Sequence, residues 1–554
     1  MAPSEDLRST SRRAFLRATA LLGGAAAAEL AGLARAGRAE GQGTAAVRAP
    51  LDVREGGAAG DGEADDTAAI QRALDEARGG GLVVLPAGRY LASTLHLRDG
   101  VTLRLEGGAV LLGHPSDRRY DRMEKLPYRT GSDAETSDAS FALLSGRGLT
   151  GVVIEGEGTI DANREERGGP KPIALKQCRE VRVRGIRIAN SPNYALSLIG
   201  CEGVEIEAVR VVNSFSDGID PDCCRHVRIA GCEVESDDDG ICLKASLALG
   251  ERVPTEHVVI EGCTIRSASN AIKLGSESSG DFRDIRVRDC TVVYPAAVDV
   301  PPRIAEGGGI ALEMVDGGTL EDVVVERIAI AGVPAPLFVR LGNRGREQDP
   351  KRPGRLRNVA IRGIRATGAS FTSSITGLPE APARGVRLED VEIALAGKAP
   401  GRFPEKLASV PERPDAYPTP RMFGVLPAAG LYCRHVEELD LRGLRFTGAA
   451  ADPRPALVAD DLGAGRVEGL RVESSSGAGP IVWLEQAREV ALRGARAPAG
   501  TALFLRVSGE RSAGIELAGN DLAGAARAVE LGPGVAPDAV RDTGAAAAPE
   551  PESS

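Results

Sequence analysis

The sequence predicts an all-β fold, a right-handed parallel β-helix (solenoid) with a short N-terminal capping helix. Short apolar segments of the form Val-x-Ile recur along the chain, and between residues 181 and 285 they follow one another at 23, 23, 31 and 27 residues. Repeats of this length indicate stacked supersecondary units. The segments alternate at period two, are rich in β-branched residues and are separated by Gly, Asn or Ser, which favours strands and turns over helices. They begin at Val152, Val181, Val204, Val227, Val258, Ile285, Val323, Val359 and Val386.

Four cysteines support the same repeat. Cys201, Cys232, Cys263 and Cys290 are separated by 31, 31 and 27 residues. Equivalent inward residues of a parallel β-helix lie about 4.8 Å apart, so we expect these four to form one interior ladder. The alternative is metal binding or disulfides. Nine cysteines is an odd number, and no CxxC pair indicates zinc.

The N-terminus has the pattern of an export signal. Ser11-Arg12-Arg13-Ala14-Phe15-Leu16-Arg17 precedes an Ala-rich apolar stretch, and Ala34-Arg35-Ala36 offers a cleavage site. We interpret residues 1–36 as a twin-arginine signal peptide and 37–50 as a flexible linker. The alternative is a solvated basic tail before a short helix. The signal predicts a periplasmic or extracellular location.

Residues 51–533 are predicted to form a single β-helix domain. Its N-terminal cap region, 51–112, contains a helix with Asp66 as N-cap and Gly79-Gly80-Gly81 as its end. The apolar face of that helix would close the open end of the solenoid, and it consists of Ile70, Ala73, Leu74 and Ala77. The catalytic coils would span 145–400 and the C-terminal coils 430–533. The Pro/Ala/Glu-rich tail, 534–554, is predicted to be disordered.

Composition limits the partners. The 554-residue chain has a net charge of −10 and only 3% aromatic residues, which argues against a basic nucleic-acid surface with stacking platforms. Outside the signal, no stretch reaches the roughly 18 apolar residues of a membrane span. We therefore expect a monomer that binds a polysaccharide or oligosaccharide substrate, with no nucleic-acid or membrane partner.

Two acidic runs lie about one repeat apart: Ser216-Asp217-Gly218-Ile219-Asp220 and Asp237-Asp238-Asp239-Gly240-Ile241. Stacked coils would bring their carboxylates together, and mutual repulsion raises the pKa of one of them. A protonated and an ionised carboxyl about 6.5–9.5 Å apart can cleave a glycosidic bond with inversion. The alternatives are a solvated acidic turn or a calcium loop using Asp220, Asp222 and Asp237, although no EF-hand spacing is present. We predict no metal and no cofactor.

With these residues in view, residues 51 to 400 resemble family 28 of the glycoside hydrolases, the polygalacturonase-like enzymes of the pectinase β-helix superfamily. The resemblance is carried by Gly60-Asp61-Gly62 with Leu85-Pro86-Ala87-Gly88-Arg89-Tyr90, by Gly158-Thr159-Ile160-Asp161, by Ser191-Pro192-Asn193-Tyr194 and by the two acidic runs. It implies that Asp238 is the general acid that protonates the leaving oxygen. It also implies that Asp217 and Asp239 hold and deprotonate a water on the opposite face of the sugar, with inversion.

The sequence departs from the family pattern at two places. Asn270 stands where the family usually has a histidine, and we expect it to lie over Asp239 and orient it by hydrogen bonding. The family's Arg-x-Lys motif, which binds the sugar carboxylate, is absent; the comparable stretch is Gly309 to Met314. Glu313 or Glu277 facing a uronate would repel it. The other expected substrate-binding residues are Asp220, Lys244, Lys273, Arg340, Asn343 and Arg344.

The sequence thus predicts an exported glycoside hydrolase that cleaves pectin-like polysaccharide or oligosaccharide of the galacturonide or rhamnogalacturonan type. A neutral sugar such as rhamnose or galactose remains open. So does exo action, if the inserts at 115–140 and 400–422 close one end of a groove. The alternatives are a polysaccharide lyase or epimerase that uses calcium and Lys244 or Lys273 as base, and a carbohydrate-binding β-helix without catalysis.

Overall fold

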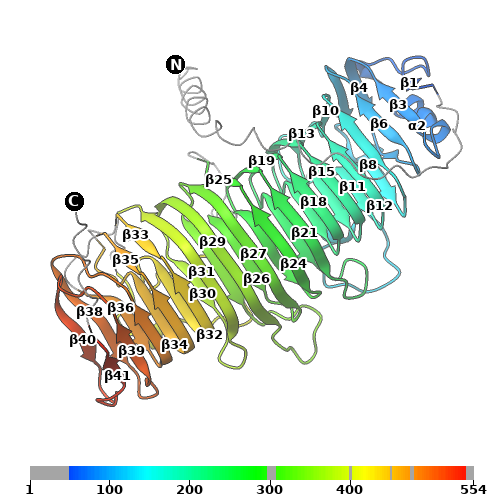
Figure 1. Ribbon diagram of the computed structural model, residues 1–554. Coiled ribbons are helices and arrows are strands. Elements are labelled where there is room, and N and C mark those ends of the chain that lie inside the picture. The colour runs from blue at the N-terminus through cyan, green and yellow to red at the C-terminus, as the bar shows by residue number, and fades with distance from the viewer. Residues whose placement is uncertain (1–48, 296–306, 398–401, 449–451, 474–478, 545–554) are drawn as a thin grey trace, which may run out of the picture. The chain divides into compact units, whose positions relative to one another are not determined.

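The computed structural model describes residues 49–295, 307–397, 402–448, 452–473 and 479–544. The signal peptide expected at 1–36, and the linker up to residue 48, lie outside this range. The described chain is a right-handed parallel β-helix, as predicted: every pairing between named strands is parallel, and strands stack coil after coil (Figure 1). Each coil contributes strands to three ladders, here called ladder 1, ladder 2 and ladder 3. None of the helices in the described residues is long and apolar enough to cross a membrane.

Ladder 1 carries the two acidic runs at the entry to its strands. It is built from β5 (Leu95–His96), β8 (Ala142–Arg147), β11 (Lys171–Lys176), β14 (Leu196–Ile199), β17 (Ile219–Asp222), β20 (Ile241–Ala245), β23 (Asn270–Ser278), β26 (Gly308–Met314), β28 (Ala335–Leu341), β30 (Ser373–Thr376), β32 (Leu431–Arg442), β34 (Leu457–Glu468), β36 (Pro480–Glu485), β38 (Thr501–Ser508) and β40 (Ala525–Leu531).

Ladder 2 shares β32 and β34 with ladder 1. Its other strands are β1 (Leu51–Asp52), β3 (Leu82–Leu85), β6 (Thr102–Leu105), β9 (Val153–Gly156), β12 (Arg179–Arg184), β15 (Glu202–Glu207), β18 (Arg225–Ala230), β21 (Thr255–Glu261), β24 (Phe282–Arg288), β27 (Thr319–Ala331), β29 (Arg355–Ala369), β31 (Ala383–Leu395), β37 (Arg488–Arg493), β39 (Ile515–Ala518) and β41 (Val540–Asp542).

Ladder 3 shares the long strands β27, β29 and β31 with ladder 2. Its other strands are β2 (Asp61–Asp65), β4 (Gly88–Ala92), β7 (Ala109–Gly113), β10 (Thr159–Asp161), β13 (Arg187–Ser191), β16 (Arg210–Ser214), β19 (Glu233–Ser236), β22 (Thr264–Ser267), β25 (Thr291–Val293), β33 (Arg445–Thr447) and β35 (Arg471–Val472).

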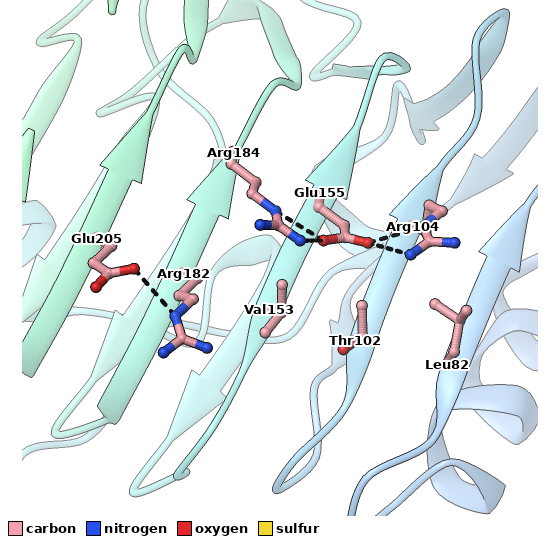
Figure 2. A pocket seen from close by; sticks show the side chains of 8 residues that line it. All are labelled: Leu82, Thr102, Arg104, Val153, Glu155, Arg182, Arg184 and Glu205. Atoms are coloured by element: carbon pink, nitrogen blue, oxygen red, sulfur yellow. Dashed lines mark hydrogen bonds and ion pairs between the residues drawn. The ribbon is translucent and has the colours of Figure 1, made fainter. Parts of the chain in front are cut away.

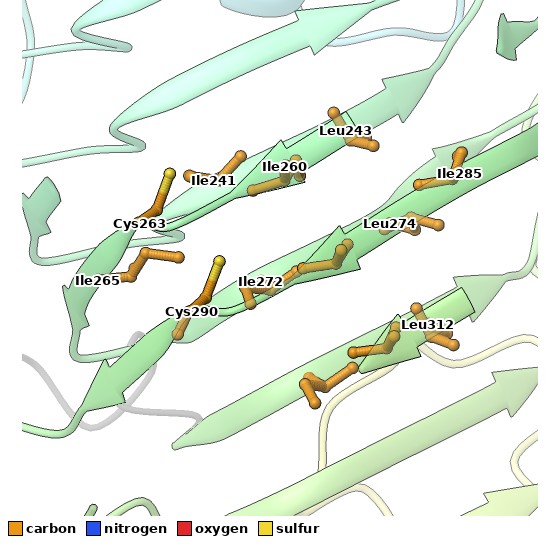
Figure 3. Close-up of a cluster of buried hydrophobic side chains, with 14 of the residues drawn as sticks. Ile241, Leu243, Ile260, Cys263, Ile265, Ile272, Leu274, Ile285, Cys290 and Leu312 are labelled. Carbon is orange, nitrogen blue, oxygen red and sulfur yellow. The ribbon is translucent and has the colours of Figure 1, made fainter. Parts of the chain in front are cut away.

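The core is a set of apolar columns inside the coils. Strand alternation turns every second residue inward, so Ile219, Ile241, Ile272 and Ile310 follow one another through ladder 1 and are all buried. Figure 3 shows this packing for the coils around β20 to β26, where Leu243, Leu274 and Leu312 form a second column. The core therefore repeats with the coils, and it fixes the height at which each outward side chain lies.

The buried cysteines form two ladders, which corrects the expected single one. Cys232, Cys263 and Cys290 precede the ladder 3 strands β19, β22 and β25 and stack as predicted; Cys263 and Cys290 are seen in Figure 3. Cys201 instead precedes the ladder 2 strand β15 and stacks with Cys178 and Cys224, because the 31-residue step from 201 to 232 crosses from one ladder to another. All nine cysteines are free and buried, as expected of small apolar residues.

The N-terminal helix is present as predicted. The helix α2 (Thr67–Glu76) buries Ile70 and Leu74 completely and Ala73 and Ala77 nearly so. Asp66 lies at the N-cap, but its carboxylate makes no capping hydrogen bond. It accepts hydrogen bonds from the amides of Ala59 (2.6 Å) and Gly60 (3.0 Å) instead, so this side chain fastens the preceding loop.

The coils continue further toward the C-terminus than expected. Residues 540–542, placed by the sequence in a disordered tail starting at 534, form β41 and pair in parallel with β39. The segments around Val467 and Val490, within the expected C-terminal coils, are regular strands of ladder 2. The rest of the expected tail, 545–554, lies outside the described residues.

The outer face of ladder 2 carries charges whose sign alternates from coil to coil. Arg104, Glu155, Arg184 and Glu207 occupy neighbouring strands in register. Glu155 accepts hydrogen bonds from the Nε atoms of Arg104 (2.8 Å) and Arg184 (2.9 Å), and the two guanidinium groups hold its pKa below the usual value despite burial (Figure 2). A shallow pocket of about 370 Å³ on this face is lined by Arg104, Glu155, Arg182, Arg184 and Glu205, on a different ladder from the strands that follow the acidic runs.

Candidate active site

The acidic residues lie in the turns that lead into ladder 1. Asp217 lies between β16 and β17, and Asp238 and Asp239 lie between β19 and β20. Ile219 pairs with Ile241, and the Gly218 amide donates to the Asp239 carbonyl (2.9 Å), so Asp217 and Asp239 are neighbours on consecutive coils. A side chain at Gly218 would lie 2.6 Å from the Gly240 carbonyl oxygen, so glycine is required for this close approach of the turns.

The three carboxylates expected to be catalytic form one cluster. One oxygen each of Asp217, Asp238 and Asp239 lies within 4.8 Å of the others. This is closer than the separation of about 6.5–9.5 Å predicted for an inverting pair. The difference arises because the acids come from directly stacked turns. One water that forms hydrogen bonds of about 2.8 Å to two of these carboxylates fits such a separation.

Asp217 and Asp220 share one buried cation. The Nζ of Lys244 donates to Asp217 Oδ2 (2.9 Å) and also to Asp220 Oδ2, and it lies 3.9 Å from the centre of the Tyr194 ring. Burial raises the pKa of Asp217, but Lys244 and its other partners outweigh it and hold that pKa below the usual value. Burial and the neighbouring Asp217 raise the pKa of Asp220 well above its usual value. Asp217 is therefore the ionised member of this pair.

Asp239 is oriented from the next coil. Asn270 donates to Asp239 Oδ1 from its backbone amide (3.1 Å) and from its side-chain Nδ2 (3.0 Å), the hydrogen bond expected from the repeat. Lys273 Nζ lies 3.0 Å from Asp239 Oδ2 and 3.7 Å from Glu313 Oε2. Both oxygens of Asp239 are thus held by donors that cannot themselves accept a proton.

Asp238 is the acid of the cluster that reaches solvent, with 22% of its side chain exposed. Burial of its carboxyl and the negative charges of Asp217 and Asp239 raise its pKa to about 7, although the nearby Arg167 acts in the opposite direction. Arg167 Nη1 donates to Asp238 Oδ2 at 2.5 Å. The cluster therefore combines an ionised Asp217 with a protonatable Asp238, the division of roles that acid–base catalysis requires.

The insert at 115–140 covers ladder 1 on the N-terminal side of the acids. It contains the 3₁₀ turn η1 (Asp117–Arg119) and the short helix α3 (Ala134–Ser137). The Tyr128 hydroxyl donates to the Ala248 carbonyl (2.7 Å), and Lys176 on β11 donates to Glu124 (3.1 Å). The insert thus shields the outer face of β11 and β14 and packs against the loop that follows β20.

A second insert covers ladder 1 on the C-terminal side. Residues 402–426, which include the 3₁₀ turn η2 (Leu407–Ser409), place Leu407, Val410 and Phe423 against the outward Phe338 of β28. Arg340 is completely buried beneath it and donates to the carbonyls of Glu412 and Arg413, each at 3.0 Å. Contrary to the expectation that Arg340 meets the substrate, its guanidinium anchors this insert.

The remaining expected binding residues form ion pairs beside the acids. Arg344 donates to Asp316 (Nε to Oδ1, 2.9 Å), and Arg346 Nη1 lies 3.1 Å from Glu277 Oε1. Burial raises the pKa of Glu277, but Lys244, Arg344, Arg346 and Lys273 lower it further, so Glu277 is ionised. The Asn343 amide donates to the Pro414 carbonyl of the second insert (2.6 Å).

Burial separates the expected binding residues into two groups. Asp220, Lys244, Lys273, Glu313 and Arg340 are buried to 3% exposure or less. They support the acids or the insert behind the solvent-facing surface. Asn343 and Arg344 are partly exposed, and Glu277 is at the limit of burial.

Sequence reasoning missed four residues at the site. Arg167 and Arg346 lie on loops and contact Asp238 and Glu277. Tyr417, an exposed ring on the second insert, accepts a hydrogen bond from Lys273 (3.3 Å), and the Tyr194 ring lies against Lys244. Tyr194 belonged to a recognised motif and could have been proposed. The other three come from loops without a repeat, and no spacing signals them.

The calcium alternative with Asp220, Asp222 and Asp237 does not match the side-chain positions. Asp222 accepts hydrogen bonds from the Ser246 amide (2.9 Å) and hydroxyl, and Asp220 is held by Lys244. Among the described residues, the groups of acidic or sulfur ligands close enough to share an ion are Asp217 with Asp238 and Asp239, and Asp217 with Asp220 and Cys242. Each includes Asp217, whose carboxylate is already held by Lys244.

Comparison with known proteins identifies the family. Residues 129–403 match the model for glycosyl hydrolases family 28, and residues 51–117 match a model described as rhamnogalacturonase A/epimerase, pectate lyase-like. A probable polygalacturonase of Vitis vinifera is 28% identical over 345 residues, which cover 58% of this chain and 68% of that protein.

Solved structures share the fold. An exopolygalacturonase from Thermotoga maritima superposes with a TM-score of 0.50 at 21% identity, covering 63% of this chain and 87% of that one. The tailspike protein of E. coli bacteriophage HK620 also reaches 0.50, at 12% identity, over 84% of this chain and 80% of that one. With the family model and the similarity to the Vitis vinifera protein, the chain belongs to family 28 of the glycosyl hydrolases and is a polygalacturonase-like hydrolase of glycosidic bonds.

Proposed function

We propose that the protein hydrolyses pectic polysaccharide or oligosaccharide of the galacturonide type with inversion, using Asp238 as general acid and Asp217 with Asp239 as the water-binding base. The observation that carries the proposal is the cluster itself: one oxygen of each of the three carboxylates lies within 4.8 Å of the others, with Asp217 held by Lys244 and Asp238 facing solvent. The pKa of Asp238 is raised to about 7 while that of Asp217 is held below its usual value. An acid with a pKa near the working pH is the efficient proton donor.

The attacking water would bind between Asp217 and Asp239. Their nearest oxygens lie within 4.8 Å, a span that one water bridges with two ordinary hydrogen bonds. Because Lys244 and Lys273 neutralise these carboxylates only in part, the pair can still take the proton that the water loses as it attacks the anomeric carbon.

The short separation of the acids raises retention as a competing outcome, since a carboxylate close to the acid can attack the sugar directly. The contacts favour inversion. Each oxygen of Asp217 and of Asp239 has a donor from the protein: Lys244 and the Asp239 amide on Asp217, Asn270 and Lys273 on Asp239. Donors on both oxygens fix the orientation of each carboxylate, which favours holding a water between them over direct attack on the sugar.

The two inserts favour action near a chain end. The first insert lies on one side of the acids and the second on the other, and Arg346 lies 3.4 Å from Asp133 of the first insert while it pairs with Glu277. A long polymer crossing the coils would have to pass both inserts. We therefore propose release of terminal residues from short chains.

The lyase alternative fits these contacts less well. A lyase needs an uncharged base beside the bond that is cleaved. Burial lowers the pKa of Lys244, but Asp217 and Asp220 outweigh it and raise that pKa well above the usual value, so Lys244 stays charged. A binding protein without catalysis would retain a cluster of buried like charges at a cost in stability and without use.

Export completes the proposal. The twin-arginine pattern at 1–36 would take the folded protein to the periplasm or beyond, where pectic fragments occur. Cell fractionation of the tagged chain, compared with Arg12→Lys/Arg13→Lys, tests this step: the variant should stay in the cytoplasm.

Product analysis tests the reaction. Purified protein is incubated with oligogalacturonides, rhamnogalacturonan fragments and neutral pectic side chains, and products are read by mass, ultraviolet absorption and early proton NMR. We expect the first products to be single uronic acid units, each carrying the mass of one added water. Their anomeric configuration should at first be inverted relative to the substrate. Unsaturated products that absorb in the ultraviolet would identify a lyase. A retained anomer would refute the water-binding role of Asp217 and Asp239. No turnover on any substrate would refute the proposed hydrolysis of pectic sugars.

A further inference from the structure

The strongest unexplained contact at the site joins Asp238 to Arg167. Arg167 belongs to the loop between β10 and β11, a part of the chain that the family motifs leave unassigned. Its Nη1 donates to Asp238 Oδ2 at 2.5 Å, and its Nη2 lies 3.4 Å from Glu135 of the first insert. The proposed proton donor is thus paired with a cation that opposes its protonation.

Arg167 is also the most accessible of five cations around the acids. Its side chain is 37% exposed, against 26% for Arg346 and 10% for Arg344. Lys244 and Lys273 are buried behind the carboxylates. An anionic sugar approaching Asp238 from solvent would therefore meet the Arg167 guanidinium first.

The loop around Arg167 permits the side chain to move without refolding. On one side Arg164 Nη1 donates to the His114 carbonyl (3.0 Å) and its Nη2 to Asp117 (2.7 Å). On the other, the Gly168 amide donates to the Pro192 carbonyl (2.9 Å). Between these anchors Arg167 is exposed, and rotation about its flexible stem can carry the guanidinium away from Asp238.

We propose that Arg167 is an exchangeable counter-ion: it binds the Asp238 carboxylate in the free enzyme and leaves it for the carboxylate of a bound uronic acid. This inference rests on the proposed function and names the residue that replaces the missing Arg-x-Lys motif. Once Arg167 has moved, Asp238 takes one proton from solvent and passes it to the leaving oxygen as the glycosidic bond breaks. The water adds hydroxide to the anomeric carbon and gives its proton to Asp217 or Asp239.

The electrostatics of Asp238 support this exchange. The charged groups that face it are Asp217 and Asp239 on the stacked turns and Arg167 in front, with Glu135 behind Arg167; Lys244 and Lys273 lie beyond the two acids. Of the groups in direct contact, Arg167 alone lowers the pKa of Asp238. Its removal to a substrate carboxylate therefore favours the protonated acid, and recognition of a uronate would prepare the donor.

Kinetics of Arg167→Gln on a galacturonide oligosaccharide and on its methyl ester test the proposal. The substitution removes a charged hydrogen bond to the uronide carboxylate, which the methyl ester does not have. KM for the uronide should therefore rise about 10- to 100-fold, and KM for the ester should change little. The pH profiles give a second readout, because kcat/KM reports the free enzyme and kcat the complex. On the uronide, the alkaline limb of kcat should lie at higher pH than that of kcat/KM in the wild type. In the variant the two limbs should coincide.

Arg164→Gln is the matched control, since it loosens the same loop without touching Asp238. It should affect acid and ester alike. The proposal is overturned if Arg167→Gln also treats both substrates alike, if Arg164→Gln reproduces its selectivity, or if the wild-type limbs already coincide on the uronide. If the wild-type protein hydrolyses neither substrate, the proposed function fails and this inference with it; if hydrolysis is normal and only the selectivity is missing, this inference alone fails.

Discussion

The outer faces of ladder 1 and ladder 2 are built from the same coils but treat charge in opposite ways. On ladder 2 the signs alternate, as in Arg182 and Glu205, whose Nε and Oε2 lie 3.1 Å apart with both side chains exposed. At the entry to the ladder 1 strands three acids stack together, with Asp217 and Asp239 buried and the Asp238 side chain 22% exposed.

The difference shows what turns a repeating scaffold into a reactive site. Exposed ion pairs of alternating sign are screened by water, and each contributes only about 0–1 kcal/mol to the stability of the fold. Buried like charges cannot all ionise, so their pKa values separate. Burial raises the pKa of both Glu155 and Asp238, but the two arginines beside Glu155 outweigh it and lower that pKa, whereas the two acids beside Asp238 raise its pKa further. Burial of the Asp238 carboxyl and the charges of the two acids on the stacked turns together create the proposed acid.

Asp238→Asn is expected to produce the largest effect. It removes the proton donor but little packing, so kcat should fall about 10²- to 10⁴-fold with circular dichroism and melting behaviour preserved. Asp237→Asn, at the neighbouring half-buried position, is the control and should retain activity. If a well-folded Asp238→Asn protein turned over substrate normally, the acids at ladder 1 would be no more functional than the charged pairs of ladder 2.

Lys244→Met should cause the largest loss of stability. It leaves Asp217 and Asp220 facing each other in the interior without their shared cation, and breaking a buried pair costs about 3–5 kcal/mol. Urea unfolding measures the change, with exposed Lys406→Met as control. Adding Asp220→Asn to Lys244→Met should recover part of the loss, and a lack of recovery would contradict the shared-cation account.

The pH dependence of stability gives a smaller, signed effect. Between its ordinary value of 3.8 and about 7, folded Asp238 keeps a proton that the unfolded chain has released, so rising pH favours unfolding across this window. Asp238→Asn removes this contribution to the pH dependence of stability. The melting temperature of the variant minus that of the wild type should increase from pH 4 to pH 8, and a constant difference would count against the raised pKa.

The smallest effect is expected on ladder 2. A double-mutant cycle of Arg182→Gln and Glu205→Gln should give a coupling free energy of about 1 kcal/mol or less, decreasing with added salt. Thermal unfolding in low and high salt measures it. A coupling of several kcal/mol would mean that exposure does not distinguish the two faces.

Much of the fold followed from the sequence because the coils repeat. Alternating apolar residues fixed the strands, and the step of 31 residues between Asp239 and Asn270 placed their hydrogen bond correctly. The same reasoning failed for Cys201, since equal spacing does not tell one ladder from another when coil lengths vary.

The surroundings of the acids could not be derived in this way. Arg167, Arg346 and Tyr417 lie on loops whose paths depend on tertiary contacts rather than on the repeat. Arg340 looked like a solvent-facing cation because its strand position is outward, but the second insert, distant in sequence, covers that position.

Infrared difference spectroscopy of the carboxyl stretch between pH 5 and pH 9 tests the central claim most directly, with wild-type protein compared against Asp238→Asn. The account predicts one carboxyl that loses its proton near pH 7 in the wild type and is missing from the variant. If the wild type and the variant give the same spectra across this range, Asp238 does not lose a proton near pH 7, and the account of Asp238 as the tuned proton donor is contradicted.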